Sequence, residues 1–310
     1  MVHSGGIRRS NIGWFAYMDR EFQGRCDFFK LSKHGSPLTG SLNVNWRELM
    51  VRIPDSHPRK KSLESRQKIV DGSSMGLLAD SAMIAHGRGE AFDYLLGERT
   101  TESAREAIRE SAARLGNARR PVISVNGNTT VLAGDGAIRL AAVLGCPIEV
   151  NLYYRTPSRV KGLISLLEEL RLNVSQEAAP DGFYGDWKET VEGVSLLGES
   201  PNFKIEGLEG PRSNCTAEGI GGADTILVPL EDGDRCEALI TLGKEVLVVD
   251  LNPLSRSARM ASVTIVDEVS RAFEGILSCL LNDSEYRQAE WDNLKSLNGS
   301  LKEISNHFSV

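Results

Sequence analysis

From residue 120 onward, the sequence alternates short runs rich in valine and isoleucine with segments of helical periodicity. Runs that are apolar at nearly every position are typical of strands buried on both faces of a sheet. The predicted strands cover residues 121–125, 148–154, 225–228, 246–249 and 263–266. The predicted helices between and after them cover residues 137–144, 159–170, 235–242 and 270–281. This alternation predicts an α/β fold over residues 120–282, with a Rossmann-like parallel sheet flanked by helices.

Three helices are predicted ahead of the sheet, and together they form a helical N-terminal cap over residues 54–117. The first is expected to begin near Pro58, because proline suits the first turn of a helix. The second and third cover about residues 75–97 and 102–115.

A glycine-rich part of the second predicted helix contains His86 and Arg88, each followed by a glycine. Gly87 and Gly89 each cost about 1 kcal/mol relative to alanine in a helix. We therefore expect either a close approach of another group or a break in the helix there. For His86 two interpretations are open: a hydrogen-bonded core histidine, or a contact to a substrate or phosphate that makes it a candidate catalytic residue.

The remaining segments differ from the main domain, which we place at residues 50–282. Residues 1–49 are rich in glycine, serine, arginine and aromatics and show no regular period. We expect either an N-terminal appendage or a start codon assigned too early, with Met50 as the true start; the alternative is an arm that packs on a partner subunit. Residues 283–310 are polar and expected to be peripheral. Residues 173–215 are longer than a usual connection, which predicts a surface insertion or a lid.

Composition excludes several classes of protein. The formal net charge is -6, whereas general nucleic-acid binders usually carry a basic excess. No apolar run approaches the roughly 20 residues of a membrane-spanning helix, and no apolar segment follows the N-terminus as in a secretory signal. The five cysteines are scattered and never spaced as C-x-x-C. We therefore expect a cytoplasmic protein with no disulfide framework and no zinc site.

Polar residues follow several of the predicted strands. These strand ends are 126–128, 153–156, 231–235 and 250–253. In an open parallel sheet, ligands bind at the carboxyl ends of the strands. The combination therefore predicts a ligand site there, although a structural turn stays open for any single Asn-Gly pair.

The segment after the fifth predicted strand is suited to a nucleotide. Asp250 ends an apolar strand, where a carboxylate can accept hydrogen bonds from ribose hydroxyls. Arg256 and Arg259 follow and can contact phosphates. The sequence contains no G-x-x-x-x-G-K-[ST] loop and no G-x-G-x-x-G after the first strand. That argues against a P-loop kinase and against an NAD-dependent dehydrogenase using Asp250.

Seven ordered blocks of unusual composition carry a family resemblance. They are Ile53–Arg59, Ser65–Ile69, Ile84–Leu95, Pro121–Asn128, Glu149–Thr156, Val228–Arg235 and Val249–Arg259. Together they resemble the archaeal-type phosphopantothenate synthetases, which are 4-phosphopantoate–β-alanine ligases.

The resemblance implies an AMP-forming ligase of coenzyme A biosynthesis and a homodimer. It would join 4-phosphopantoate to β-alanine while ATP, with Mg²⁺, is converted to AMP and pyrophosphate through an acyl-adenylate. The family's nucleotide contacts fall on Arg66, Arg88, Asp250, Leu251, Asn252, Arg256, Ser257, Glu268 and Val269. One departure is Glu268, where the family usually has asparagine.

For phosphopantoate we expect contacts from residues at strand ends or in the matched blocks. They are Asn126, Asn128, Arg155 and Arg212. No Ser/His/Asp or Cys/His set is evident, so we expect positioning and charge stabilisation rather than a covalent nucleophile. The alternative function is a non-catalytic regulatory protein that binds adenine nucleotides.

Overall fold

The computed structural model describes residues 53–229, 232–282 and 290–307. The predicted extension 1–49 therefore lies outside the described residues. Within the described part, no helix is long and apolar enough to cross a membrane.

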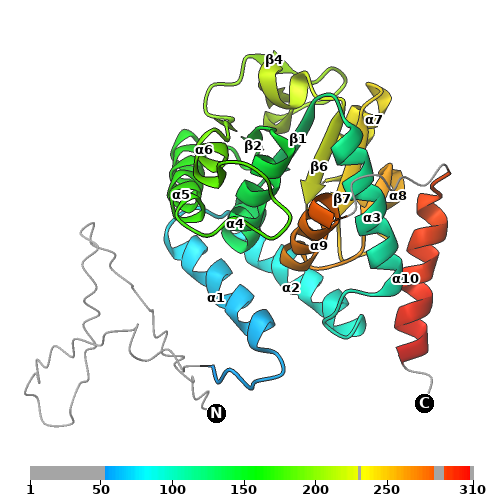
Figure 1. Ribbon diagram of the computed structural model, residues 1–310. Coiled ribbons are helices and arrows are strands. Elements are labelled where there is room, and N and C mark those ends of the chain that lie inside the picture. The colour runs from blue at the N-terminus through cyan, green and yellow to red at the C-terminus, as the bar shows by residue number, and fades with distance from the viewer. Residues whose placement is uncertain (1–52, 230–231, 283–289, 308–310) are drawn as a thin grey trace, which may run out of the picture. The chain divides into compact units, whose positions relative to one another are not determined.

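The described residues form a six-stranded parallel sheet in the order β3-β2-β1-β6-β7-β8 (Figure 1). Its strands are β1 (Pro121–Val125), β2 (Ile148–Val150), β3 (Leu196–Leu197), β6 (Thr225–Pro229), β7 (Glu245–Val249) and β8 (Val263–Ile265). The predicted α/β class and five of these strands are confirmed. The second strand is shorter than predicted, and the edge strand β3 was not predicted.

Each face of the sheet is covered by its own layer, because successive strand residues point to opposite faces. On one face, strand residues such as Ile123 pack with α3 (Glu102–Asn117), α4 (Gly127–Leu144), α5 (Pro157–Ser175) and α9 (Val269–Asn282). On the other face, residues such as Val122 pack with α7 (Gly233–Thr241) and with Ile205, Cys215 and Ile220.

Of the three helices predicted for the cap, α1 (Lys60–Ser74) and α2 (Ser81–Leu95) lie side by side next to α4, and we call these two the cap (Figure 1). The third, α3, packs instead on α9 and β8 in the layer that covers the sheet. The first helix was predicted to begin near Pro58, and α1 begins two residues later, at Lys60. The second helix starts later than predicted and is not broken at its glycines. A Cβ on Gly89 would meet Leu251 at 3.5 Å, an ordinary contact, and one on Gly87 would meet nothing within 4 Å.

Helix α4 starts ten residues earlier than predicted, directly after β1. Asn126 is its N-cap: the Asn126 side chain accepts a hydrogen bond from the Thr129 amide at 3.0 Å. Ala133 has non-helical angles (φ −141°, ψ 27°), so the helix is kinked there. The Asn126-Gly127 pair therefore has a structural role at the start of α4, and it also lies at the carboxyl end of β1.

The irregular stretch 173–215 contributes to the core as well as to the surface. It contains α6 (Trp187–Glu192), the edge strand β3, the antiparallel pair β4 (Phe203–Lys204) and β5 (Asn214–Cys215), and the short turn η1 (Pro211–Ser213). Two further short elements, η2 (Ala217–Gly221) and α8 (Arg256–Met260), follow later in the chain. At the C-terminal end, α10 (Asn293–His307) packs on α3, with Leu297 and Ser300 buried.

Candidate active site

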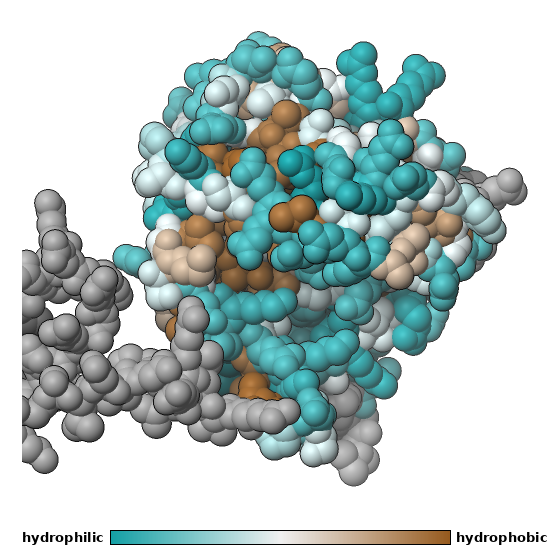
Figure 2. All heavy atoms as spheres, turned by 60° about the vertical axis from the view of Figure 1, so that its left-hand side comes forward, coloured by the Kyte–Doolittle hydropathy of each residue, from teal (hydrophilic) through white to brown (hydrophobic). Residues whose placement is uncertain are grey.

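A pocket of about 770 Å³ lies between the cap helices and the N-terminal ends of α4 and α9. Residues that follow β1, β2, β7 and β8 also line it, so it lies at the carboxyl edge of the sheet. Parallel sheets bind ligands at this edge, and ligand pockets commonly have this size. On the side that carries α1, α5 and α6, apolar surface is gathered in the middle and framed by hydrophilic side chains (Figure 2).

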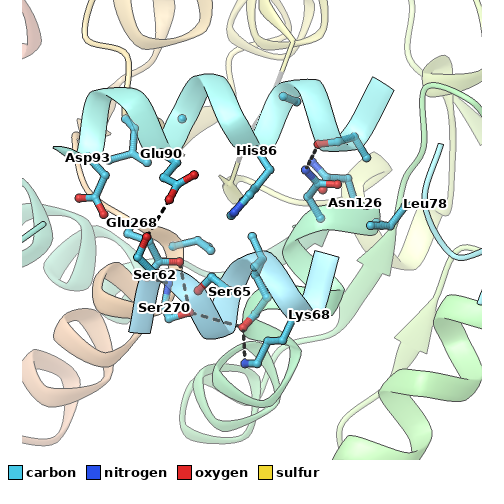
Figure 3. Close-up of a pocket in the computed structure, with 18 of the residues that line it drawn as sticks. Ser62, Ser65, Lys68, Leu78, His86, Glu90, Asp93, Asn126, Glu268 and Ser270 are labelled. Atoms are coloured by element: carbon cyan, nitrogen blue, oxygen red, sulfur yellow. Dashed lines mark hydrogen bonds between the residues drawn. The ribbon is translucent and has the colours of Figure 1, made fainter. Parts of the chain in front are cut away.

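His86 points from α2 into this pocket, toward α1 (Figure 3). Its Nε2 atom is buried and has no hydrogen-bond partner among the described residues. Burial lowers the pKa of His86 below its ordinary value, against smaller opposing effects of Glu90 and Glu268. A buried polar atom of this kind is normally satisfied, so the pocket side of His86 is suited to a ligand. The alternative of a satisfied core histidine is not what the structure shows.

Glu90 lies one helical turn after His86 and connects the two cap helices. Its Oε1 atom accepts hydrogen bonds from Ser62 at 2.9 Å, from Arg59 at 3.0 Å and from Arg66 at 2.7 Å. Arg59 also pairs with Glu98 at 2.9 Å. The α1 arginines are thereby held close to the pocket wall.

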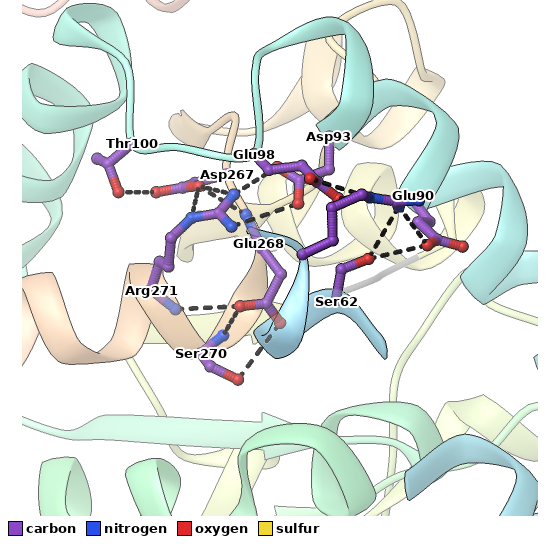
Figure 4. A network of polar contacts seen from close by, with 10 residues as sticks. Ser62, Glu90, Asp93, Glu98, Thr100, Asp267, Glu268, Ser270 and Arg271 are labelled. Atoms are coloured by element: carbon purple, nitrogen blue, oxygen red, sulfur yellow. Dashed lines mark hydrogen bonds and ion pairs between the residues drawn. The ribbon is translucent and has the colours of Figure 1, made fainter. Parts of the chain in front are cut away.

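Arg271, near the start of α9, lies between two carboxylates (Figure 4). Its Nε donates to Asp267 Oδ1 at 2.8 Å, and its Nη2 donates to Asp93 Oδ1 at 2.5 Å. Thr100 donates its hydroxyl to the other Asp267 oxygen at 2.6 Å. All four residues of this network line the pocket.

Glu268 forms part of the same wall. Its carboxylate accepts hydrogen bonds from the Ser270 amide at 2.9 Å and from the Arg271 amide at 3.2 Å. It therefore satisfies free amides of the first turn of α9, as capping side chains do. The carboxylate that replaces the usual asparagine thus has a structural function in this chain.

The kink in α4 forms a junction of three helices beside the pocket. The Leu132 carbonyl accepts hydrogen bonds from Lys68 Nζ of α1 at 3.1 Å and from Ser270 Oγ of α9 at 3.4 Å. Lys68, Leu132 and Ser270 all line the pocket. The kink therefore provides an acceptor that ties α1 and α9 to α4.

The Asp250 carboxylate is engaged within its own loop. It accepts hydrogen bonds from the Asn252 amide at 2.9 Å and from the Ser255 hydroxyl at 2.5 Å. Burial raises the pKa of Asp250, and these hydrogen bonds and Arg88 oppose the shift. Ser255 in turn caps α8.

The other predicted nucleotide residues lie around this loop. Ser257 is buried, and Leu251 is buried beside Gly89 of α2. Arg256 is exposed and forms ion pairs with Asp234 and Glu237.

The residues predicted for phosphopantoate occupy two places. Asn126, Asn128 and Arg212 line the pocket, and Arg212 Nη1 donates to Asp232 Oδ2 at 2.7 Å. The Arg212 carbonyl accepts from Asn151 Nδ2 at 3.3 Å, which fixes η1 against the end of β2. Arg155 donates instead to the carbonyls of Gly198 and Glu199, next to the edge strand.

The pocket therefore brings together part of the predicted set. Its lining includes His86, Asn126, Asn128, Arg212, Leu251, Glu268 and Val269. The predicted residues outside this lining are Arg66, Arg88, Arg155, Asp250, Asn252, Arg256 and Ser257. Of the polar strand ends, those after β1 and β2 contribute several lining residues, and the one after β7 contributes Leu251.

Sequence reasoning missed Asp93, Asp267, Arg271 and Lys68. The helical spacing was a usable signal, because Asp93 lies seven residues after His86 on one face and Asp267 lies four before Arg271. Pairing between Asp93 and Arg271, 178 residues apart, has no local signal. Among the described residues, no group of three or more His, Cys, Asp or Glu side chains is arranged to hold a metal ion.

Comparison with known proteins agrees with the residue pattern. A family model described as phosphopantothenate/pantothenate synthetase matches residues 103–307. A 4-phosphopantoate–β-alanine ligase of Thermococcus onnurineus is 45% identical over 262 residues, covering 82% of this chain and 93% of the relative. The same figures hold for the ligase of Thermococcus kodakarensis. The ligase of Methanosarcina mazei is 41% identical over 268 residues, covering 84% of this chain and 97% of the relative. The chain therefore belongs to the phosphopantothenate/pantothenate synthetase family.

Proposed function

We propose that the protein condenses 4-phosphopantoate with β-alanine, using ATP and releasing AMP and pyrophosphate. The observation that carries the proposal is the pocket at the carboxyl edge of the sheet, which brings His86, the Asn126–Asn128 strand end and the Glu268–Val269 loop into one volume. Relatives that match most of the chain carry the name of this ligase. The volume of about 770 Å³ is ample for more than one small substrate.

The reaction needs an activated carboxylate, because hydroxide is a poor leaving group. A carboxylate oxygen of phosphopantoate attacks the α-phosphorus of ATP, and the bond to the β-phosphate oxygen breaks to release pyrophosphate. The amine nitrogen of β-alanine then attacks the acyl carbon of the adenylate. The carbon–oxygen bond to AMP breaks, AMP leaves with the electron pair, and the new amide loses one proton.

A further proton must leave the β-alanine ammonium before the attack, and we propose His86 as its acceptor. β-Alanine carries an ammonium at neutral pH, which must lose a proton before its nitrogen can attack. The buried Nε2 atom of His86 faces the pocket, and the lowered pKa keeps the imidazole neutral and able to accept. General bases of this kind contribute about 10²–10⁴-fold to a rate.

The nucleotide is assigned to the wall formed by the loops after β7 and β8. We propose contacts from Asp250, Leu251, Asn252, Arg256, Ser257, Glu268 and Val269, with Arg66 and Arg88 supplied by the cap. The arginines stabilise phosphate charge by charge-assisted hydrogen bonds. The phosphopantoate contacts we propose are Asn126, Asn128, Arg155 and Arg212.

Mg²⁺ fits this site as a companion of ATP rather than as an ion caged by protein. The described residues offer no cluster of three metal-binding side chains. Mg²⁺ commonly keeps several waters and binds through substrate phosphates.

We further propose a cytoplasmic homodimer. None of the four described cysteines forms a disulfide with another, as is typical of a reducing compartment. The cap exposes apolar side chains, among them Val70 at 47% and Met75 at 68%, which a second copy would cover. Light scattering of the purified protein at twice the chain mass supports the dimer, and a monomer at all concentrations contradicts it.

A product assay tests the proposed function. We expect multiple turnovers to AMP, pyrophosphate and phosphopantothenate in equal amounts only when ATP, phosphopantoate and β-alanine are all present. Without β-alanine, pyrophosphate stops at about one equivalent per site, since the adenylate forms first. Nucleotide binding without any pyrophosphate would instead support the regulatory alternative, and ADP as product would contradict the adenylate.

A further inference from the structure

Arg271 connects two walls of the pocket that come from distant parts of the chain. Asp93 belongs to α2, and Asp267 lies in the loop between β8 and α9. The Arg271 guanidinium contacts Asp93 through two nitrogens, at 2.5 and 3.3 Å, and Asp267 through two nitrogens, at 2.8 and 2.6 Å. Figure 4 shows this guanidinium between the two carboxylates.

Both carboxylates are joined to residues of the proposed site. Asp93 follows His86 and Glu90 on the pocket face of α2, at spacings that place all three on one side of a helix. Asp267 immediately precedes Glu268 and Val269, and its Oδ1 accepts from the Glu268 amide at 2.8 Å. A displacement of Arg271 would therefore move the His86 helix and the Glu268 loop relative to each other.

The network is buried. Side-chain exposure is 17% for Arg271, 7% for Asp93 and 0% for Asp267. The two carboxylates raise the pKa of Arg271, so its charge is retained. Buried ion pairs often contribute little net stability compared with apolar residues of similar size, because desolvation offsets their attraction. What the pairs provide is a fixed geometry.

Helix α2 contributes few buried residues to the core. All of its residues, Ser81–Leu95, are described, and among them Asp93 alone is buried. The network thus supplies a directional contact where the apolar contacts of α2 are sparse.

We propose that Arg271, with Asp93 and Asp267, is a positioning residue that fixes His86 relative to the nucleotide loop Glu268–Val269. This inference rests on the proposed function, since it takes the site from there. The guanidinium is suited to the position because it is planar and can donate to two carboxylates at once, whereas an ammonium is a point charge. Arg271 itself is not proposed to touch the reacting atoms.

The test uses Asp93→Asn and Arg271→Lys in the full chain, with kinetics for each substrate separately. We expect the KM for ATP to rise about tenfold and kcat to fall about tenfold to a hundredfold, as misplacement of catalytic groups by about 1 Å does. The KM for phosphopantoate should change less than the KM for ATP, because Arg212 is held by Asn151 and Asp232 rather than by residues of this network. Arg271→Lys should retain more activity than Arg271→Met.

A matched control lies at the opposite edge of the sheet. Arg114 of α3 is 13% exposed and pairs with Glu110 at 2.7 Å, four residues earlier, and with Glu245 of β7 at 3.3 Å. It thus also lies between two carboxylates, one of them fully buried, but it does not line the pocket. Arg114→Lys should change the melting temperature about as much as Arg271→Lys does, with all KM values and kcat unchanged.

The outcomes separate this inference from the proposed function. Wild-type kinetics in folded Asp93→Asn and Arg271→Lys would overturn the positioning of His86 by Arg271. An equal rise in the KM of every substrate, seen also in Arg114→Lys, would mean that the variants act through a loss of stability. That result would also overturn the positioning of His86 by Arg271. If His86→Gln also retains full activity, the proposed site itself fails. If only the Arg271 and Asp93 variants are unaffected, the proposed function stands and the inference fails.

Discussion

Helices α2 and α4 lie next to each other in the structure, yet they bury opposite kinds of residue. Helix α4 has 18 residues, of which eleven are buried and most are apolar. Helix α2 has 15, of which one is buried, and that one is Asp93. The difference indicates two roles. Helix α4 stabilises the fold by burying apolar residues, and α2 places polar groups in the pocket.

The comparison extends to what each helix exposes. The α4 residues Ile138 and Leu140 are fully buried in the main core. On α2, the large apolar side chains of Met83, Ile84 and Tyr94 are exposed instead. A helix that buries so little apolar surface contributes little to folding, so changes in α2 should affect catalysis more than stability.

The largest effect is expected from His86→Gln in α2. Loss of a general base should lower kcat about a hundredfold to ten-thousandfold. Because burial lowers the pKa of His86 below its ordinary value of 6.5, the wild-type kcat should fall only as the pH drops below that value. At higher pH the imidazole is already neutral, so the rate should be flat with respect to this group.

The pH profile of His86→Gln provides the check on this interpretation. The acid limb should disappear in the variant while the melting temperature stays within a few degrees. An unchanged acid limb would assign the titration to another group and remove His86 from the mechanism.

The reverse pattern is expected in α4. Leu140 is fully buried, so Leu140→Ala should lower the free energy of unfolding by about 2–5 kcal/mol. The kinetic constants of the protein that remains folded should be unchanged. Met83→Ala in α2, where the side chain is 48% exposed, is the control and should change stability by less than about 0.5 kcal/mol. Comparable losses in the free energy of unfolding for both variants, measured by urea denaturation, would contradict the assignment of stability to α4 rather than to α2.

A smaller effect is expected from Arg256, whose side chain is 58% exposed. Arg256→Gln should raise the KM for ATP roughly tenfold, as the loss of a charge-assisted hydrogen bond would. The difference from wild type should shrink in high salt, since exposed charges are screened. An unchanged KM for ATP would exclude Arg256 from the nucleotide site.

The smallest effect is expected from Glu237→Gln, which removes a partner of Arg256. Exposed ion pairs of this kind contribute little to stability. The unfolding free energy should therefore stay close to that of the wild type. A larger loss would mean that the loop after β7 depends on this pair.

The sequence was sufficient for most of the sheet because strands buried on both faces are apolar throughout. It was not sufficient for α4, whose start at Gly127 follows from capping by Asn126 rather than from apolar periodicity. It also missed β3, whose two residues are too few to show a pattern. Residues near strand ends or in matched blocks, such as His86, Asn126 and Glu268, could be predicted as pocket residues. The contact between Asp93 and Arg271 could not, because side chains from distant elements meet only after folding.

The central claim is that this protein activates the carboxylate of phosphopantoate as an adenylate. Phosphopantoate labelled with heavy oxygen in its carboxylate tests it most directly, with mass spectrometry of the products after a full turnover with ATP and β-alanine. The account predicts one labelled oxygen in AMP and none in pyrophosphate, because the attacking oxygen stays on the α-phosphorus. Label in inorganic phosphate or pyrophosphate, or AMP free of label, would contradict it.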